Sequence, residues 1–141
     1  MTRPIRVLLV EDNPGDADLI RDTLDSGARK LDMAVVGDGA AASDYLLRRG
    51  AYVDAERPDL VLLDLNLPGV DGRRVLAEMR MHNELRAIPV VVLTSSDAES
   101  DIAGSYQAGA SCYVTKPGEL TAFQSAVKSI ETFWFKVAKL P

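Results

Sequence analysis

Residues 60–64 read Leu60-Val61-Leu62-Leu63-Asp64, four branched apolar residues followed at once by a carboxylate. A short run of this kind is typical of a strand that is buried on both faces of a sheet. Similar runs recur along the chain, each followed by an amphipathic segment, which predicts an α/β fold with helices on both faces of a parallel sheet. We predict strands at 7–10, 33–37, 60–64, 89–94 and 112–115, and helices at 14–26, 40–49, 73–81, 98–108 and 119–136.

Length and charge narrow the class of protein. The chain has 141 residues, a length that one domain usually fills, so we expect a single domain over residues 1–141. Its 16 basic residues against 21 acidic ones give a net charge of -5, the wrong sign for a protein that binds nucleic-acid phosphates. No apolar run approaches the roughly 20 residues that span a bilayer. We therefore expect neither nucleic acid nor membrane among its partners.

Two single residues and the amino terminus exclude further classes. Cys112 is the only cysteine and His82 the only histidine, which argues against a thiolate metal cluster and against a hydrolase built on a Ser/Cys–His pair. The amino terminus reaches Glu11 and Asp12 too soon for the apolar region of a signal peptide. We expect a cytoplasmic protein.

The carboxy-terminal segment combines a regular apolar stripe with extra aromatic residues. Spacings of three and four place on one helix face Leu120, Phe123, Val127, Ile130, Trp134 and Val137. Phe133 and Phe135 fall off that stripe, and we expect residues 133–141 to form a carboxy-terminal extension of the last helix. Aromatics outside the buried face suggest a surface that meets another chain, although scattered exposed aromatics are an open alternative.

Polar side chains stand at the carboxyl ends of four predicted strands. Glu11 and Asp12 follow the first strand, Asp64 ends the third, Thr94 ends the fourth, and Lys116 follows the fifth. In an open parallel sheet these ends line the crevice where ligands bind. Each residue alone has an ordinary explanation, but their coincidence at equivalent positions predicts one shared site.

This residue set favours a divalent cation and a phosphoryl group. Three carboxylates in one pocket repel one another, and Mg²⁺ prefers such oxygens together with water and phosphate oxygens. A carboxylate such as Asp64 can attack phosphorus and form an aspartyl phosphate while Mg²⁺ and Lys116 neutralise the transferring oxygens. The Thr94 hydroxyl can then donate to the new phosphoryl group, so Thr94 and its loop would move.

These residues resemble the receiver domain of two-component response regulators, and the likeness spans nearly the whole chain. It rests on Val7–Asn13, Leu62–Pro68 with Asp71-Gly72, Val92–Ser95, and Ala108–Ala110 leading to Tyr113–Pro117. The resemblance implies a doubly wound, flavodoxin-like sheet of order 2-1-3-4-5 flanked by five helices. It also implies a phosphoacceptor signalling domain that catalyses only its own phosphorylation and dephosphorylation.

The resemblance assigns roles to particular residues. Asp64 would accept the phosphoryl group from a partner histidine kinase, with Thr94 and Lys116 assisting. Mg²⁺ would be held by Asp12, Asp64 and the main-chain oxygen of Asn66, with Glu11 acting mostly through water. Tyr113 would be an aromatic switch that turns inward when Thr94 moves, and the Lys116–Pro117 bond would be cis.

A narrower likeness is to the single-domain regulators that pair with phytochrome kinases. It lies in the loop 52–58, the strand end 112–116 and the tail with Phe133-Trp134 and Leu140-Pro141. It implies a phytochrome-type kinase, a downstream protein partner, and a homodimer through the last helix and the extension, with Phe133, Trp134 and Phe135 on the dimer surface.

Two other classes remain as alternatives. A Mg²⁺-dependent phosphohydrolase of the haloacid dehalogenase type also uses an aspartyl nucleophile. That class requires a second acidic residue two positions after the nucleophile, where this chain has Asn66. A constitutive interaction module would never be phosphorylated, and the intact set of Asp64, Thr94 and Lys116 argues against it.

Overall fold

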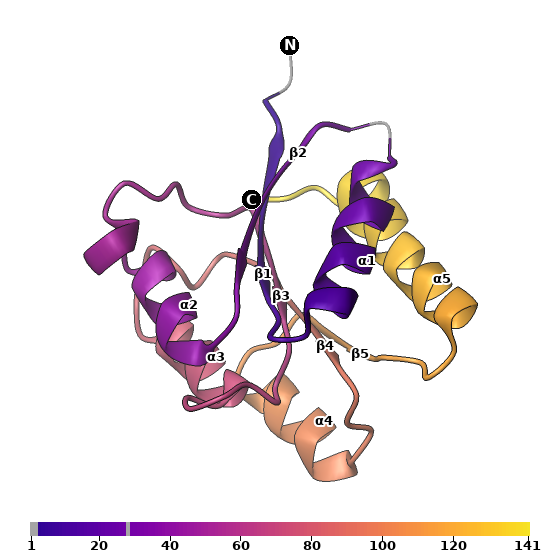
Figure 1. The fold of residues 1–141 in the computed structure, drawn as a ribbon. Helices are drawn as coiled ribbons and strands as arrows, with labels where there is room; N and C mark the ends of the chain where they lie inside the picture. The colour runs from indigo at the N-terminus through magenta and orange to yellow at the C-terminus, as the bar shows by residue number, and fades with distance from the viewer. Residues whose placement is uncertain (1–2, 28) are drawn as a thin grey trace.

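A five-stranded sheet lies between two layers of helices in the computed structural model, which describes residues 3–27 and 29–141 (Figure 1). The predicted domain also includes Met1, Thr2 and Ala28, which lie outside the described residues. The strands are β1 (Ile5–Val10), β2 (Leu31–Val36), β3 (Leu60–Leu63), β4 (Val90–Thr94) and β5 (Cys112–Thr115). The helices are α1 (Pro14–Asp25), α2 (Gly39–Leu46), α3 (Gly72–Arg80), α4 (Glu99–Gln107) and α5 (Leu120–Glu131).

The strand order is β2-β1-β3-β4-β5, and every neighbouring pair is parallel. The predicted alternation of strands and helices and the implied order are therefore confirmed. Within the sheet, β2 lies next to one edge of β1, and the chain then crosses over so that β3 lies next to the other edge of β1. Strand order reverses between β1 and β3, so the crevice expected of such folds opens at their carboxyl ends.

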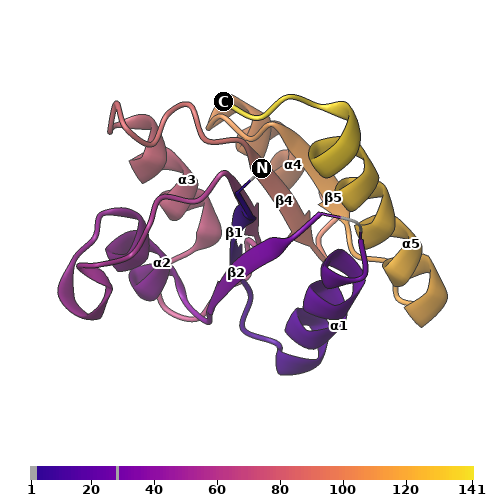
Figure 2. The same ribbon diagram turned by 90° about the horizontal axis from the view of Figure 1, so that it is seen from above.

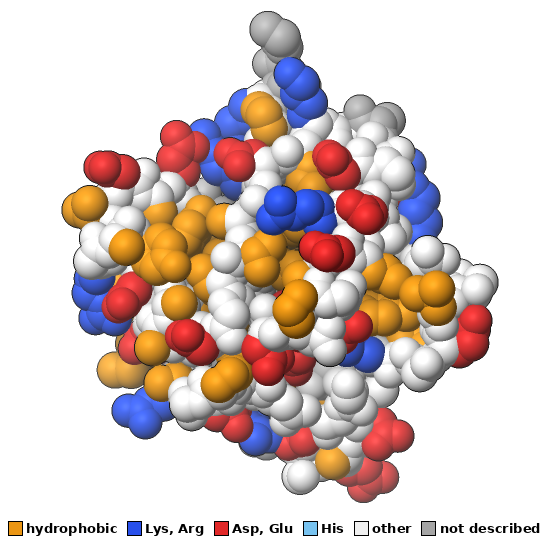
Figure 3. Space-filling model, in the orientation of Figure 1, with side chains coloured by type: hydrophobic (Ala, Val, Ile, Leu, Met, Phe, Trp, Pro, Cys, Tyr) orange, Lys and Arg blue, Asp and Glu red, His pale blue; other side chains and the backbone are white. Residues whose placement is uncertain are grey.

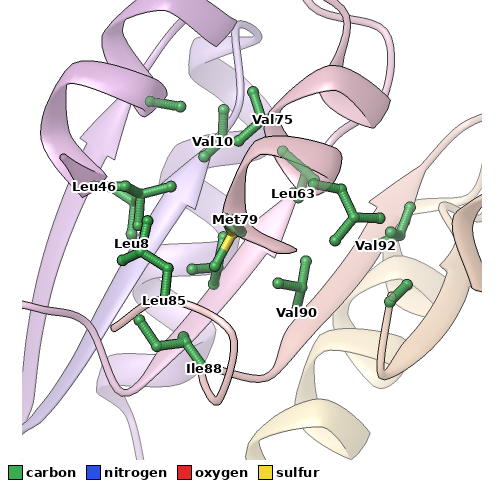
Figure 4. Close-up of a cluster of buried hydrophobic side chains, with 14 of the residues drawn as sticks. Leu8, Val10, Leu46, Leu63, Val75, Met79, Leu85, Ile88, Val90 and Val92 are labelled. Atoms are coloured by element: carbon green, nitrogen blue, oxygen red, sulfur yellow. The ribbon is translucent and has the colours of Figure 1, made fainter. Parts of the chain in front are cut away.

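Helices cover both faces of the sheet, α1 and α5 on one and α2, α3 and α4 on the other (Figure 2). Figure 4 shows how side chains from β1, β3 and β4 meet Leu46 of α2 and Met79 of α3 in one apolar cluster. A second cluster joins Ile20 of α1 and Val127 of α5 to the opposite face. Strands buried on both sides explain the nearly continuous apolar runs in the sequence.

Helix α4 is the least buried of these helices. Of its nine residues only Ser105 is buried. Its two ends are tied down instead by polar contacts, one to Arg73 in the first turn of α3 and one between the Tyr106 hydroxyl and the Tyr113 main-chain N–H at 3.1 Å. Because apolar burial is what usually anchors a helix, α4 is held less firmly than the helices that fill the two cores.

The last helix ends earlier than predicted. Helix α5 stops at Glu131, and Thr132–Val137 form a π-helical turn closed by a 2.7 Å hydrogen bond from the Ala138 N–H to the Phe133 oxygen. A π turn holds more residues than an α turn, so it rotates the residues that follow.

This rotation changes which aromatic residues are exposed. Phe135 is 6% exposed and packs in the cluster below α1 and α5, so its prediction as a surface residue is wrong. Phe133 is 50% exposed, as predicted. Val137, which the α-helical spacing placed on the core-facing stripe, is exposed at the end of the turn, and Leu120 is exposed at the first position of α5. The predicted stripe therefore holds only for the central part of the helix.

Figure 3 shows acidic and basic side chains interspersed over one face of the molecule, with hydrophobic side chains visible between them. This face has no continuous basic surface of the kind that binds nucleic-acid phosphates. Among the described residues, no helix is both long and apolar enough to cross a membrane.

Candidate functional site

The carboxyl edge of the sheet brings together the side chains that the sequence placed at strand ends. Glu11 and Asp12 follow β1, Asp64 follows β3, Thr94 is the last residue of β4, and Lys116 follows β5. A 2.7 Å hydrogen bond from the Lys116 main-chain N–H to the Thr94 oxygen holds the last two strands together at this edge. These residues share one edge because parallel strands all end on the same side.

The ammonium group of Lys116 lies at the centre of the site. Its Nζ is 2.5 Å from Glu11 Oε1, 3.0 Å from Asp16 Oδ2 and 3.0 Å from Asp64 Oδ2, and the side chain is 6% exposed. Burial alone would lower the pKa of this ammonium, but the hydrogen bonds with Glu11 and Asp64 outweigh it and raise the pKa above its usual value. Lys116 is therefore firmly charged at neutral pH.

The peptide bond after Lys116 differs from the expectation. No described peptide bond is cis, so the Lys116–Pro117 bond is trans and the implied cis bond is wrong. The trans form is the more stable one by roughly 0.5–1 kcal/mol for a bond that precedes proline.

Three carboxylates form an all-oxygen cluster beside Lys116. Each of Glu11, Asp12 and Asp64 offers one oxygen within 4.8 Å of the others. Glu11 and Asp64 are buried, whereas Asp12 is exposed. Burial raises the pKa of the Glu11 carboxyl, and the hydrogen bond from Lys116 opposes part of that shift. One ammonium does not balance these charges, and hard oxygen donors in this number fit Mg²⁺ or a similar divalent cation.

Hydrogen bonds hold Asp64 in a fixed orientation. Its Oδ1 accepts from the Asn66 main-chain N–H at 3.0 Å, and its Oδ2 accepts from Lys116. The Asn66 side-chain amide in turn donates to the Thr94 hydroxyl at 3.4 Å. Thr94 is fully buried. Asn66 thus connects the Asp64 carboxylate, which would attack phosphorus, to the Thr94 hydroxyl, which we expect to respond to phosphorylation. The assignment of the Asn66 main-chain oxygen to the cation stays a prediction.

The loop after Thr94 is fastened to neighbouring elements by polar contacts. The Tyr113 hydroxyl donates to the Ser96 oxygen at 2.7 Å, and the Ser96 hydroxyl donates to Asp101 at 2.5 Å. Arg73 of α3 pairs with Asp101 and also with Asp71, the latter at 2.9 Å. The predicted switch residue Tyr113 is therefore attached to the same loop that carries Thr94.

Two features of this site were not predicted from the sequence. Asp16 contacts Lys116 from the first turn of α1, and the two residues are 100 positions apart in the sequence. The ion pair between Arg73 and Asp101 joins residues 28 positions apart. No local sequence pattern predicts a contact over that separation.

A second candidate surface lies on the free edge of β5, which pairs only with β4 among the described strands. A mostly apolar hollow of about 490 Å³ is lined there by residues that include Cys112, Val114, Ile130, Phe133 and Trp134. The rings of Phe133 and Trp134 meet edge to face with centroids 5.1 Å apart. Phe133 and Trp134 therefore lie together on this surface, whereas Phe135 points into the core.

Comparison with known proteins adds independent findings. A family model described as the response regulator receiver domain matches residues 7–128. Response regulator Rcp1 from Synechocystis sp. is 42% identical over 98% of this chain and 94% of its own length. Its Mn²⁺-bound structure matches with a TM-score of 0.95 over 98% of this chain and 99% of that one.

Two further solved structures are similar over nearly the whole chain. The phosphorylated cyanobacterial phytochrome response regulator RcpA is 45% identical, with a TM-score of 0.96 and 99% of both chains covered. The bacteriophytochrome response regulator RtBRR is 41% identical, with a TM-score of 0.76 over 99% of this chain and 85% of that one.

Proposed function

The chain belongs to the response regulator receiver family, and on that premise we propose that it accepts a phosphoryl group on Asp64 from a sensor histidine kinase. The observation that carries the proposal is the contact between Asp64 and Lys116, 3.0 Å apart within a cluster of carboxylates at the carboxyl edge of the sheet. This contact supports the proposal because Asp64 would be the nucleophile and the Lys116 ammonium would neutralise the transferring phosphoryl group.

The chemistry follows from the charges in the site. An oxygen of Asp64 forms a bond to phosphorus while the bond from phosphorus to the donor breaks, and the donor leaves with that electron pair. Lys116 offers positive charge to the transferring oxygens. Asp12 and Asp64, with Glu11 acting mostly through water, would hold Mg²⁺, and this ion would supply further positive charge. The main-chain oxygen of Asn66 completes the proposed set of ligands.

The switch begins at Thr94. Once Asp64 is phosphorylated, the Thr94 hydroxyl donates to a phosphoryl oxygen and gives up the amide of Asn66, which lies 3.4 Å away in the resting state. The loop that follows Thr94 moves with it. For Tyr113 to turn inward, the 2.7 Å hydrogen bond from its hydroxyl to Ser96 must break. The resting contacts therefore oppose the switch until the phosphoryl group stabilises the new position.

The proposed role in the cell is that of a messenger. The phytochrome names of RcpA and RtBRR support a phytochrome-type kinase as the donor. We propose that the chain acts in the cytoplasm on a downstream protein, that it catalyses no reaction other than its own phosphorylation and dephosphorylation, and that residues 1–141 act as one receiver unit.

Mass spectrometry of the intact protein tests the phosphorylation. We expect incubation with acetyl phosphate to add one phosphoryl group when Mg²⁺ is present and none when the divalent cation is removed by a chelator. The dependence follows because the site holds more negative charge than Lys116 balances. No adduct with Mg²⁺, and no binding of beryllofluoride as a stable phosphoryl mimic, would refute the proposal.

Replacing Lys116 by Ala should separate phosphorylation from the shape change. The cluster of Glu11, Asp12 and Asp64 remains, so Mg²⁺ still binds, but no ammonium holds the phosphoryl oxygens. A hydrogen bond to a charged group contributes roughly 1.5–3 kcal/mol. We expect the free energy that couples phosphorylation of Asp64 to the movement of the 94–98 loop to fall by about that amount. The measurement is the phosphorylation-dependent change in hydrogen exchange of the 94–98 loop at saturating Mg²⁺. An exposed lysine, Lys30→Ala, is the matched control, and equal responses of the two variants would contradict the role of Lys116.

The apolar surface on β5 and α5 supports a homodimer formed through the last helix, the last strand and the carboxy-terminal extension. Phe133 lies half exposed beside the hollow at this sheet edge, and a second copy of the chain would cover it. Trp134, which also packs against the core, adds to the same surface. Phe135 is excluded from it by its burial.

Substituting Phe133 by Asp should dissociate this dimer. A central aromatic residue of an interface contributes about 2 kcal/mol or more, so the dimer Kd should rise roughly thirtyfold. Because the side chain is half exposed, the monomer should remain folded. Sedimentation velocity over a range of concentrations measures the change. Met81→Asp introduces the same charge at an exposed apolar residue at the end of α3 and should leave the distribution unchanged. Identical sedimentation of wild type and Phe133→Asp would remove the dimer proposal.

A further inference from the structure

The three acceptors of Lys116 are of two kinds. An ammonium group has three N–H donors, and in this site they meet Glu11, Asp16 and Asp64. Glu11 and Asp64 belong to the carboxylate cluster that fits a divalent cation, but Asp16 does not. A cation bound to the cluster would compete with Lys116 for Glu11 and Asp64, and a phosphoryl group would compete with these two carboxylates for the ammonium. Asp16 is then the one resting partner that Lys116 keeps.

We propose that Asp16 is a positioning residue that anchors Lys116 on the α1 side of the site while the other two N–H donors turn to the phosphoryl group. The inference rests on the proposed phosphorylation of Asp64. It assigns to Asp16 no contact with phosphorus and no proton transfer. Its effect is to limit where the flexible lysine side chain can go, so that less conformational freedom is lost when phosphate arrives.

The local structure gives Asp16 a fixed place. The Asn13 side chain accepts a 2.9 Å hydrogen bond from the Asp16 main-chain N–H, and Pro14 begins the helix, so the first turn of α1 is well defined. The Asp16 carboxylate is 31% exposed, against 6% for the Lys116 side chain. It therefore keeps contact with water at the mouth of the site while it reaches a buried ammonium. Asp16 and Lys116 both line a hollow of about 530 Å³ between α1 and the start of α5.

A double-mutant cycle tests the proposal. The rate constant for phosphorylation of Asp64 by acetyl phosphate is measured at saturating Mg²⁺, by quenched time courses and intact mass. Coupling between contacting charged residues is large enough that we expect Asp16→Ala to slow the reaction about tenfold. Asp16→Asn keeps an oxygen acceptor and should fall between Ala and the wild type. In a Lys116→Ala background the same Asp16→Ala substitution should change the rate by less than about twofold, because Asp16 acts only through Lys116.

Controls separate this role from general effects. Asp18→Asn removes the same charge from an exposed position two residues along α1 and should leave the rate unchanged. Thermal unfolding of each variant shows whether the fold persists, and Asp16→Asn serves as the test should Asp16→Ala not fold. The role of Asp16 would be overturned if Asp16→Asn and Asp16→Ala were phosphorylated as fast as the wild type. It would also be overturned if Asp16→Ala slowed phosphorylation equally in the wild-type and Lys116→Ala backgrounds. Failure of the wild type itself to take up phosphate would instead refute the proposed function.

Discussion

The Asp64→Asn variant should take up no phosphoryl group from acetyl phosphate under conditions in which the wild type is fully modified. An amide does not form the acyl phosphate, and of the neighbouring carboxylates only Asp64 accepts from both the Asn66 N–H and Lys116. The asparagine has the same size and keeps one oxygen, which accepts from one of these two donors. We therefore expect the variant to fold, with a free energy of unfolding within about 1 kcal/mol of wild type.

Intact mass and urea unfolding of the same samples measure both outcomes. Asp54→Asn, at an exposed position in the loop before β3, is the matched control and should be modified like the wild type. Modification of Asp64→Asn at the wild-type rate would show that another residue accepts the phosphoryl group. If the wild type, like Asp64→Asn, took up no phosphoryl group, a constitutive interaction module would become the better interpretation.

Gly72→Ala should give the largest loss of stability. Gly72 begins α3, and its N–H donates to the Leu65 oxygen at 3.1 Å. A Cβ at this position would lie 2.8 Å from the Leu65 Cα and still closer to the main-chain oxygen of Asp64. Both atoms belong to the backbone that carries the phosphoacceptor, so neither yields without moving it. We expect the free energy of unfolding to fall by about 3 kcal/mol and phosphorylation to slow with it.

Gly104→Ala provides the contrasting substitution. Gly104 is inside α4, and apart from the backbone of that helix a Cβ at this position would meet no described atom within 4 Å. Alanine is favoured over glycine in a helix interior, so this variant should gain about 0.5–1 kcal/mol. Urea unfolding measures both proteins. Equal midpoints for Gly72→Ala and the wild type would contradict the close contact between α3 and β3.

The elements that carry the site were predictable because their signals are local. The strands that border the site are short and mostly apolar, and the polar site residue either ends the strand, as Thr94 does, or follows it at once, as Asp64 follows Leu63. Parallel strands bring such residues to one edge of the sheet, so their grouping can be predicted without knowing how the side chains pack. For this reason the grouping of Glu11, Asp12, Asp64, Thr94 and Lys116 followed from pattern alone, although their distances did not.

Features that depend on packing between distant segments were not predictable. The side chain of Asp16 was assigned no partner because its contact with Lys116 requires α1 and β5 to be placed relative to each other. The pairing of Arg73 with Asp101 likewise depends on how α3 and α4 meet. Phe135 was placed on the surface because an unbroken α-helical period was assumed up to residue 136, and the π-helical turn breaks that period.

That turn also bears on how such a chain could diverge during evolution. A π-helical turn is what one extra residue in an α-helix produces, and removal of one residue from 132–137 would restore the α-helical period. Because the π turn absorbs the extra residue, Ile130 and Phe135 would still share the buried face after such a deletion, now four positions apart. A single-codon deletion of Phe133 would thus remove the exposed ring while Phe135 keeps its place against the core. In a lineage of such proteins, partner choice at this surface could change by insertion or deletion without any substitution at the phosphorylation site.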